Sequence, residues 1–164
     1  ASLGNVADAL RLQREALRIC RELNLTIQTA EHAASLGMML SHAGEAAEAL
    51  SHLEVAEGAF RDFHLGGPLG ACLGQMANIH ARQGSLRRAF ELNEEALDLM
   101  QGSGQHVWLT TCLVNQAGLC LELGEFSIGR QRAEEALQKI KNCAAPMQLR
   151  QKCLQVLFEL KRRK

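Results

Sequence analysis

A glycine that returns every 40 residues is the feature of this sequence that most limits its possible folds. Gly44, Gly84 and Gly124 are separated by this period, and one further step back leads to Gly4. Gly84 interrupts a stretch of strong helix formers at residues 76–97, where a glycine costs about 1 kcal/mol relative to alanine. Periods of this length are typical of repeat proteins, whose units bury their apolar faces against their neighbours.

Small residues recur with the same period at three further positions. They are Gly37, Ala77 and Ala117 before the glycines, then Ala9, Ala49, Ala89 and Gly129, and finally Ala16, Ala56, Ala96 and Ala136. Small side chains let two helices approach closely where they cross. Each unit is therefore predicted to contain two antiparallel helices, and the periodic glycine is predicted to end the first of them in a left-handed conformation.

The composition favours an all-α fold. The chain has 2 prolines, no tyrosine and only 4% aromatic residues, whereas strands are enriched in aromatic and β-branched residues. We expect one repeat array over residues 1–164, with a half repeat at 1–25, repeats at about 26–65, 66–105 and 106–145, and a C-terminal helix at 146–162. That last helix either caps the stack or is the first helix of a further repeat.

The spacing resembles that of the tetratricopeptide repeat family, whose units have small residues at the eighth, twentieth and twenty-seventh positions and a glycine near the fifteenth. Ala77, Gly84, Ala89 and Ala96 occupy these positions in one unit. The 40-residue unit is longer than the usual 34 and is similar to the long repeats of Partner-of-Inscuteable-like scaffolds, kinesin light chains and rapsyn. The family's usual aromatic residues are largely missing. The resemblance implies a right-handed superhelix of helix pairs, a TPR-like α-solenoid.

By the same resemblance, partner contacts come from the first helix of each pair. The candidate peptide-binding residues at these positions are Glu31, Met38, His42, Gln75, Asn78, Arg82, Asn115 and Glu122. Asn78 and Asn115 each offer amide donors and an acceptor to a peptide backbone, and Arg82 has the fork that binds a carboxylate. The alternative interpretation is that these polar side chains are simply solvated, as exposed polar residues usually are.

Binding of chaperone C-terminal tails is not expected. Family members that clamp those carboxylates use a lysine at the fifth position of the first helix, together with further Lys or Arg residues. The fifth positions here are Ala34, Gly74 and Val114, and a later lysine position holds Thr111. The asparagines of that pattern are present, but its cations are not.

The sequence carries no sign of catalysis, and we expect no enzyme, catalytic residue, metal site or cofactor. It has no HExxH, Walker, GxSxG or dinucleotide-binding motif. Its six histidines include no pair four residues apart, and its six cysteines include no CxxC pair. The pairs Glu94-Glu95 and Glu134-Glu135 recur with the repeat and fit a solvated helix face better than acid–base chemistry.

The charge and the cysteine content limit the classes of binding partner and the cellular compartments that we expect for this chain. The formal net charge is zero, which gives no global attraction to nucleic acid or to an anionic membrane. RNA-binding repeats need basic, aromatic grooves, which the candidate positions lack. The basic end, residues 161–164, is either a favourable cationic helix terminus or a targeting or membrane-contact signal. Cysteines at apolar positions behave as reduced core residues, which favours a cytoplasmic or nuclear location.

Together these features predict a protein–protein interaction module. It would bind a peptide or helix of a partner in its concave groove and form part of a larger adaptor. The alternative is a structural or autoregulatory arm of a multidomain protein, which regulates an attached switch or catalytic domain. Self-association through the apolar ends of the stack is a further expectation.

Overall fold

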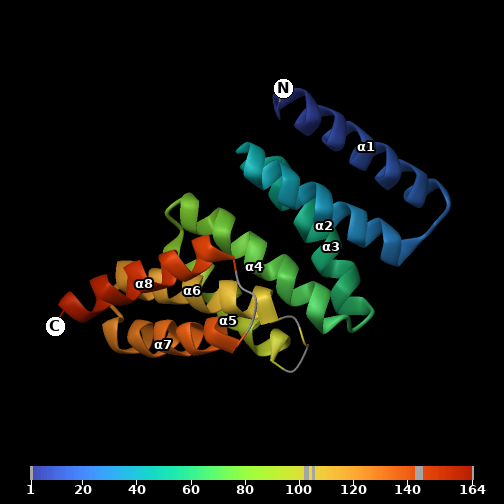
Figure 1. The fold of residues 1–164 in the computed structure, drawn as a ribbon. Helices are drawn as coiled ribbons and strands as arrows, with labels where there is room; N and C mark the ends of the chain where they lie inside the picture. Colours follow the sequence, from blue (N-terminus) through green and yellow to red (C-terminus); the bar gives the residue numbers. More distant parts are fainter. Residues whose placement is uncertain (1, 102–103, 105, 143–145, 164) are drawn as a thin grey trace.

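The array consists of paired antiparallel helices, seen in a computed structural model that describes residues 2–101, 104, 106–142 and 146–163. Within these residues the chain forms eight α-helices and no strand. They are α1 (Ser2–Glu22), α2 (Thr26–Ala43), α3 (Ala46–Asp62), α4 (Gly66–Arg82), α5 (Leu86–Met100), α6 (His106–Leu123), α7 (Phe126–Asn142) and α8 (Met147–Arg162). Each helix packs against the next, and the pairs stack from α1 to α8 (Figure 1). The predicted α-solenoid is confirmed.

The periodic glycines end the first helix of each pair. Gly44, Gly84 and Gly124 have φ angles of 90°, 79° and 79°, in the left-handed region. The residue after each glycine donates its backbone N–H to a carbonyl oxygen five residues earlier, as Ser85 does to His80 at 2.9 Å. This bond satisfies a carbonyl group that the end of a helix leaves unpaired. The apparent single helix around Gly84 is therefore a hairpin, as the period predicts.

Two features of the turns differ from the sequence expectation. Gly4 lies inside α1 and does not end a helix as the other three periodic glycines do. A second series of left-handed residues, also 40 apart, joins one pair to the next: Asn24, His64 and Gly104, with φ angles of 55°, 54° and 73°. Asn and His enter this region more readily than most residues with a side chain. Because three different residue types occupy the equivalent positions, this period cannot be recognised from the sequence.

Small residues bring the helices of a pair into close contact, as predicted. A Cβ atom added to Gly37 of α2 would lie 2.7 Å from Leu53 Cγ and 3.0 Å from the Ala49 carbonyl oxygen, both on α3. Ala49 is fully buried, and so are its counterpart Ala89 and the alanines seven residues later in each repeat. The core of the array lies along these crossings and continues between neighbouring pairs.

Replacing Gly84 with alanine is expected to lower the free energy of unfolding by about 1 kcal/mol, because a residue with a Cβ is strained at this positive φ. No atom lies within 4 Å of the added Cβ, so the effect is conformational. Urea unfolding followed by circular dichroism measures it. The control is Gly118→Ala, which also enters open space but lies within α6 and should raise stability by about 1 kcal/mol. Equal losses in the two variants would contradict this explanation.

Candidate functional site

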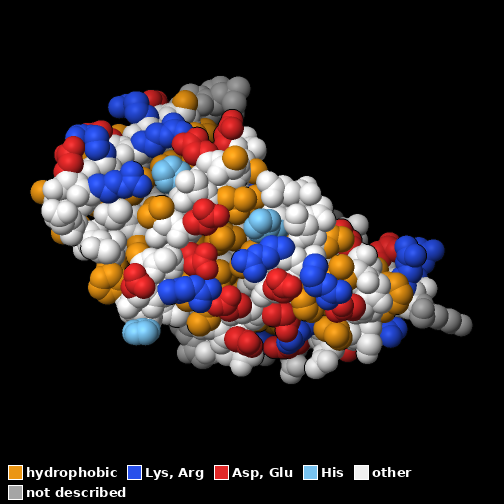
Figure 2. All heavy atoms as spheres, turned by 180° about the vertical axis from the view of Figure 1, so that it is seen from behind, with side chains coloured by type: hydrophobic (Ala, Val, Ile, Leu, Met, Phe, Trp, Pro, Cys, Tyr) orange, Lys and Arg blue, Asp and Glu red, His pale blue; other side chains and the backbone are white. Residues whose placement is uncertain are grey.

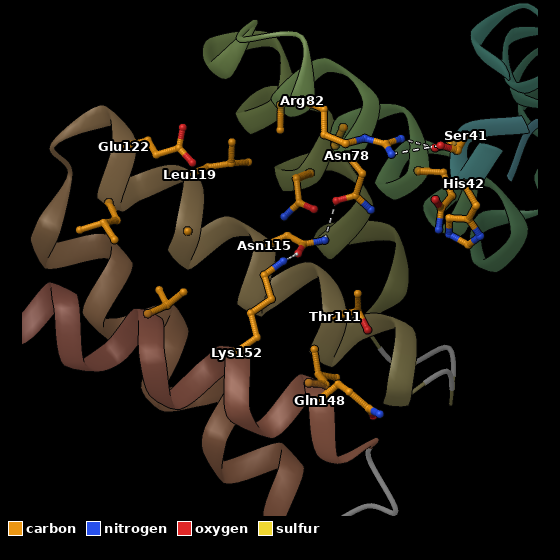
Figure 3. A pocket seen from close by; sticks show the side chains of 18 of the residues that line it. Ser41, His42, Asn78, Arg82, Thr111, Asn115, Leu119, Glu122, Gln148 and Lys152 are labelled. Atoms are coloured by element: carbon orange, nitrogen blue, oxygen red, sulfur yellow. Dashed lines mark hydrogen bonds between the residues drawn. The ribbon is translucent and has the colours of Figure 1, made fainter. Parts of the chain in front are cut away.

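A groove of about 710 Å³ runs along the first helices of the pairs, α2, α4, α6 and α8 (Figure 3). Six of the eight predicted binding residues line it. They are His42, Gln75, Asn78, Arg82, Asn115 and Glu122, beside Ser41, Thr111, Gln148, Lys152 and Val156 among others. First helices share this surface because each second helix covers the opposite side of its own pair, which leaves one continuous row of first-helix side chains.

The other two predicted residues, Glu31 and Met38, line an adjoining pocket of about 220 Å³. Its walls are mostly apolar and include Pro68 and the single tryptophan, Trp108. Gln75 lines both hollows, so the pocket opens beside the groove. Trp108 was not predicted, because it lies three residues before the first family position assigned to α6.

None of the three fifth-position residues lines the groove. Gly74 and Val114 are buried, and a Cβ on Gly74 would lie 3.0 Å from Cys112 Sγ of the next first helix. These positions therefore pack between repeats instead of facing a ligand. Ala34, at the fifth position of the first repeat, does line the apolar pocket.

A ladder of hydrogen bonds crosses the floor of the groove (Figure 3). Lys152 Nζ of α8 donates to Asn115 Oδ1 of α6 at 2.8 Å, and Asn115 Nδ2 donates to Asn78 Oδ1 of α4 at 2.7 Å. We call these three side chains the amide ladder. The side-chain oxygens of Asn78 and Asn115 both accept hydrogen bonds within the chain. The groups that remain for a ligand are therefore mainly N–H donors. The two asparagines are thus held in place by each other as well as being solvated.

Lys152 is a groove residue that sequence reasoning missed. The counterpart of Lys152 in the third repeat is Thr111, which lies 41 residues earlier. This distance exceeds the 40-residue period by one, because α8 begins 41 residues after α6. A repeated cysteine contact gives the true register. Cys153 Sγ bonds the carbonyl oxygen of Ala133 at 3.3 Å, as Cys72 Sγ bonds that of Leu53 at 3.2 Å. Although Lys152 reaches solvent, groove atoms partly desolvate its amine and lower its pKa.

Arg82 is fixed by its neighbour across the groove. Its guanidinium donates to the Ser41 carbonyl oxygen at 3.0 Å and also to the Ser41 hydroxyl oxygen. The fork that the sequence assigns to a partner carboxylate is therefore engaged by α2. An incoming carboxylate would have to replace the Ser41 contacts or use the remaining N–H groups, since a guanidinium carries five.

A buried polar cluster lies behind the groove. Asn93 Nδ2 donates to the Cys112 carbonyl oxygen at 2.8 Å and to Gln116 Oε1 at 2.9 Å. Gln116 Nε2 then donates to Glu94 Oε1 at 2.7 Å, and Arg132 pairs with the same carboxylate oxygen at 3.1 Å. Glu94 is consequently a structural link between α5, α6 and α7. Its sequence-based assignment to a purely solvated face is incomplete.

The cysteines of the described chain are structural. Cys20, Cys72, Cys112, Cys120 and Cys153 are free and buried, while Cys143 lies outside the described residues. Burial raises the pKa of Cys72 and of Cys112 to about 12 and that of Cys120 to about 11, so these thiols stay protonated near neutral pH. The described residues contain no group of three or more His, Cys, Asp and Glu side chains able to hold a metal ion.

The outer surface is of mixed charge. On the face shown in Figure 2, basic and acidic side chains alternate instead of forming a field of one sign. Some pairs join neighbouring repeats, such as Arg61 with Glu95 at 2.7 Å and Arg14 with Glu48 at 2.8 Å. Exposed pairs of this kind add little stability. Among the described helices, none is both long enough and apolar enough to cross a bilayer.

Solved structures of related repeats resemble the chain in fold. BtubC (BKLC) from P. vanneervenii gives a TM-score of 0.75 and 18% identity, covering 87% of this chain and 60% of that chain. A protein of Podosopora anserina described as a kinesin light chain, with nearly identical TPR-like repeats, gives TM-scores of 0.76 and 0.70 in two crystal structures. Both match at 14% identity and cover 97% of this chain, and 78% and 87% of the other chains.

The chain thus spans less than two thirds of the BtubC structure, and at these identities the likeness shows the fold alone. No curated protein matches the sequence significantly. Two family models, both described as Tetratricopeptide repeat, match residues 70–141 and 1–24, together more than half of the chain. Such repeats are typically non-catalytic scaffolds for protein–protein interaction. With its helix pairs, its period and these matches, the chain belongs to the tetratricopeptide repeat family.

Proposed function

We propose that the groove binds a segment of a partner protein and that the chain serves as an interaction module of a larger adaptor. The observation that carries this proposal is the convergence of Asn78, Arg82, Asn115 and Lys152 on one hollow, although they come from three different helices. Polar side chains gathered in a hollow and fixed by hydrogen bonds are suited to binding a segment in one orientation.

The two hollows suit different parts of such a segment. The apolar pocket, with Met38, Pro68 and Trp108 in its walls, suits an apolar side chain that loses contact with water on binding. The amide ladder beside it suits backbone carbonyl oxygens, because its amide N–H groups are donors. An extended segment presents side chains and carbonyl groups in alternation, so it can use both.

The charges of the groove favour a segment that carries acidic groups near α8. Lys152 lies at that end, Arg82 lies across the groove, and Glu122 is the acidic residue of the same lining. A negatively charged side chain beside Lys152 also counteracts the desolvation that lowers the pKa of its amine. The segment as a whole is expected to be of mixed charge, since Glu31 lines the apolar pocket.

The test is affinity capture followed by direct titration of the captured partner. The triple variant Asn78→Ala/Arg82→Glu/Asn115→Ala is expected to weaken binding at least about tenfold, because it removes the ladder and reverses one charge, and each lost charged contact is worth about 1.5–3 kcal/mol. Arg88→Glu is the matched control, because Arg88 lies on α5 outside both hollows and pairs only loosely with Glu91, at 3.6 Å.

Two further measurements serve as controls for this experiment. Circular dichroism must show that the triple variant is folded, because Asn78 and Asn115 also bond each other. Lys152→Glu changes an exposed side chain and should weaken binding without affecting the fold. If the triple variant and Lys152→Glu both bind the partner as tightly as the wild type, the partner binds elsewhere and the proposal fails.

A further inference from the structure

One buried polar atom beside the groove has no hydrogen-bond partner. Asn93 of α5 is completely buried and is also part of the groove lining. Its Oδ1 atom accepts no hydrogen bond from any described residue. Because α5 packs against α4 and α6 in the middle of the array, repeats added at either end would not reach this oxygen. A buried acceptor without a donor is unfavourable, which indicates that its donor comes from outside the chain.

The orientation of the Asn93 amide is fixed by the charged end of the buried polar cluster. The ionised Glu94 carboxylate can only accept, so Gln116 presents Nε2 to it at 2.7 Å and Oε1 to Asn93. Asn93 must then donate through Nδ2, and the Cys112 carbonyl oxygen at 2.8 Å requires the same. Both N–H groups of the amide are thereby engaged. Oδ1 is the group that remains for a ligand.

The position of Asn93 also borders a hollow in the preceding repeat. Leu53, 40 residues earlier, is buried and lines the apolar pocket. Met76 corresponds to Gln116 in the same way. The inner wall of the apolar pocket is therefore apolar at this position, whereas the inner wall of the groove has an unpaired acceptor there. A bound segment would meet a different selection at each of the two hollows.

We propose that Asn93 Oδ1 accepts a hydrogen bond from an uncharged side chain of the segment that binds in the groove, a serine, threonine, asparagine or glutamine. This inference rests on the proposed function of the groove. It adds that the segment is selected repeat by repeat. An apolar side chain is selected at the apolar pocket, and a hydroxyl or amide is selected beside Asn93.

The charges around Asn93 favour an uncharged donor. Glu94, the carboxylate of the cluster, already accepts from Gln116 and pairs with Arg132 at 3.1 Å, so it is not available to balance a second buried cation. Burying a charge without a partner costs far more than burying an amide or a hydroxyl. The amide ladder beside Asn93 offers N–H donors, which a hydroxyl or amide oxygen can accept, whereas lysine and arginine only donate.

The amide ladder controls the approach to this acceptor. Asn78 of α4 and Asn115 of α6 are joined by a bond of 2.7 Å (Figure 3), and both helices pack against α5, which carries Asn93. Since Asn93 is completely buried without a ligand, a donor reaches it when this bond is exchanged for bonds to the ligand. One ligand side chain then accepts from the ladder and donates to Asn93 Oδ1.

Short peptides of random sequence, displayed on phage, are the probe for this inference. Peptides that bind the wild-type chain and are lost with Lys152→Glu bind in the groove, and titration of the synthetic peptides gives their affinities. Replacing the donor side chain of such a peptide by an apolar one of similar shape, such as threonine by valine, should weaken binding at least about fivefold, because Asn93 Oδ1 is again left unpaired.

The variant Asn93→Leu/Gln116→Met gives this hollow the apolar residues of the preceding repeat. It should bind the apolar version of the peptide at least as tightly as the original, so the preference for a donor disappears. Arg88→Glu is the matched control, because Arg88 lies outside both hollows, and it should keep the preference. If circular dichroism shows that the double variant is unfolded, the peptide replacements on the wild-type chain decide alone.

Two results would overturn this inference and leave the proposed function intact. One is a set of groove-bound peptides in which every serine, threonine, asparagine and glutamine can be replaced by an apolar residue without loss of affinity. The other is a preference for the donor that persists in the folded Asn93→Leu/Gln116→Met variant. If no selected peptide depends on Lys152, the groove does not bind such segments, and the proposed function fails together with this inference.

Discussion

Gly37→Leu is expected to lower the free energy of unfolding by about 3 kcal/mol, at the upper end of the usual cost of overpacking a core. The Cβ alone would lie 2.7 Å from Leu53 Cγ and 3.0 Å from the Ala49 carbonyl oxygen. The side chain of Leu53 can adjust, but the backbone oxygen of α3 cannot move without shifting the helix. Leucine is the better helix former by nearly 1 kcal/mol, and this gain is too small to offset the collision.

Gly58→Leu is the matched control for this effect. Gly58 also lies inside a helix, α3, but it is exposed and has no atom within 4 Å of an added Cβ. Here only the helix propensity acts, so stability should rise by nearly 1 kcal/mol. Urea unfolding of both variants, followed by circular dichroism, measures the difference. Similar changes in the two variants would show that α2 and α3 are not held as closely as described.

The second large effect is expected in the buried polar cluster. Gln116→Met removes an acceptor from Asn93 and a donor from Glu94. Asn93 is completely buried, so water cannot replace the lost bond without entering the core. The other N–H of Asn93 Nδ2 still bonds the Cys112 carbonyl oxygen, so the variant leaves one buried N–H without its acceptor. Such a group costs about 1–3 kcal/mol, and we expect a loss of about 2 kcal/mol.

Adding Asn93→Leu should restore most of that loss. Leu53 and Met76 occupy the two corresponding positions one repeat earlier, where the packing is apolar. Replacing both partners of a hydrogen bond by apolar groups of similar shape is close to neutral. A double-mutant cycle in urea should therefore give a coupling of about 2 kcal/mol. Additive losses would mean that the cluster is not a unit.

The turns show why the fold could be predicted so far from sequence. At Gly84 the backbone needs a left-handed residue with no Cβ, so one residue type recurs and its period is visible. In the second series of turns Asn24 and His64 have smaller φ angles, 55° and 54°, and Gly104 has 73°, and Asn and His tolerate this part of the left-handed region. A requirement that several residue types satisfy leaves no period in the sequence.

The groove residues were predicted correctly where the family positions recur with the 40-residue period. The prediction was incomplete where they do not. Asn78 and Asn115 lie at assigned positions and line the groove. Lys152 was missed because family positions were assigned only to the three complete repeats, and the start of α8 also departs from the 40-residue period by one residue. The bond between Arg82 and Ser41 joins residues 41 positions apart, and only the stacking of α4 on α2 brings them together. Such contacts depend on how the helix pairs stack, so they cannot be predicted from a local pattern in the sequence.

The amide ladder has a mechanical consequence. Lys152, Asn115 and Asn78 belong to the first helices of successive pairs, and bonds of 2.8 Å and 2.7 Å connect them across the hollow. Any bending that spreads these helices must lengthen the bonds, and any ligand atom that takes one of the amide groups must compete with them. Bending of the array and binding of a ligand in its groove therefore act on the same hydrogen bonds, so a change in one is expected to affect the other.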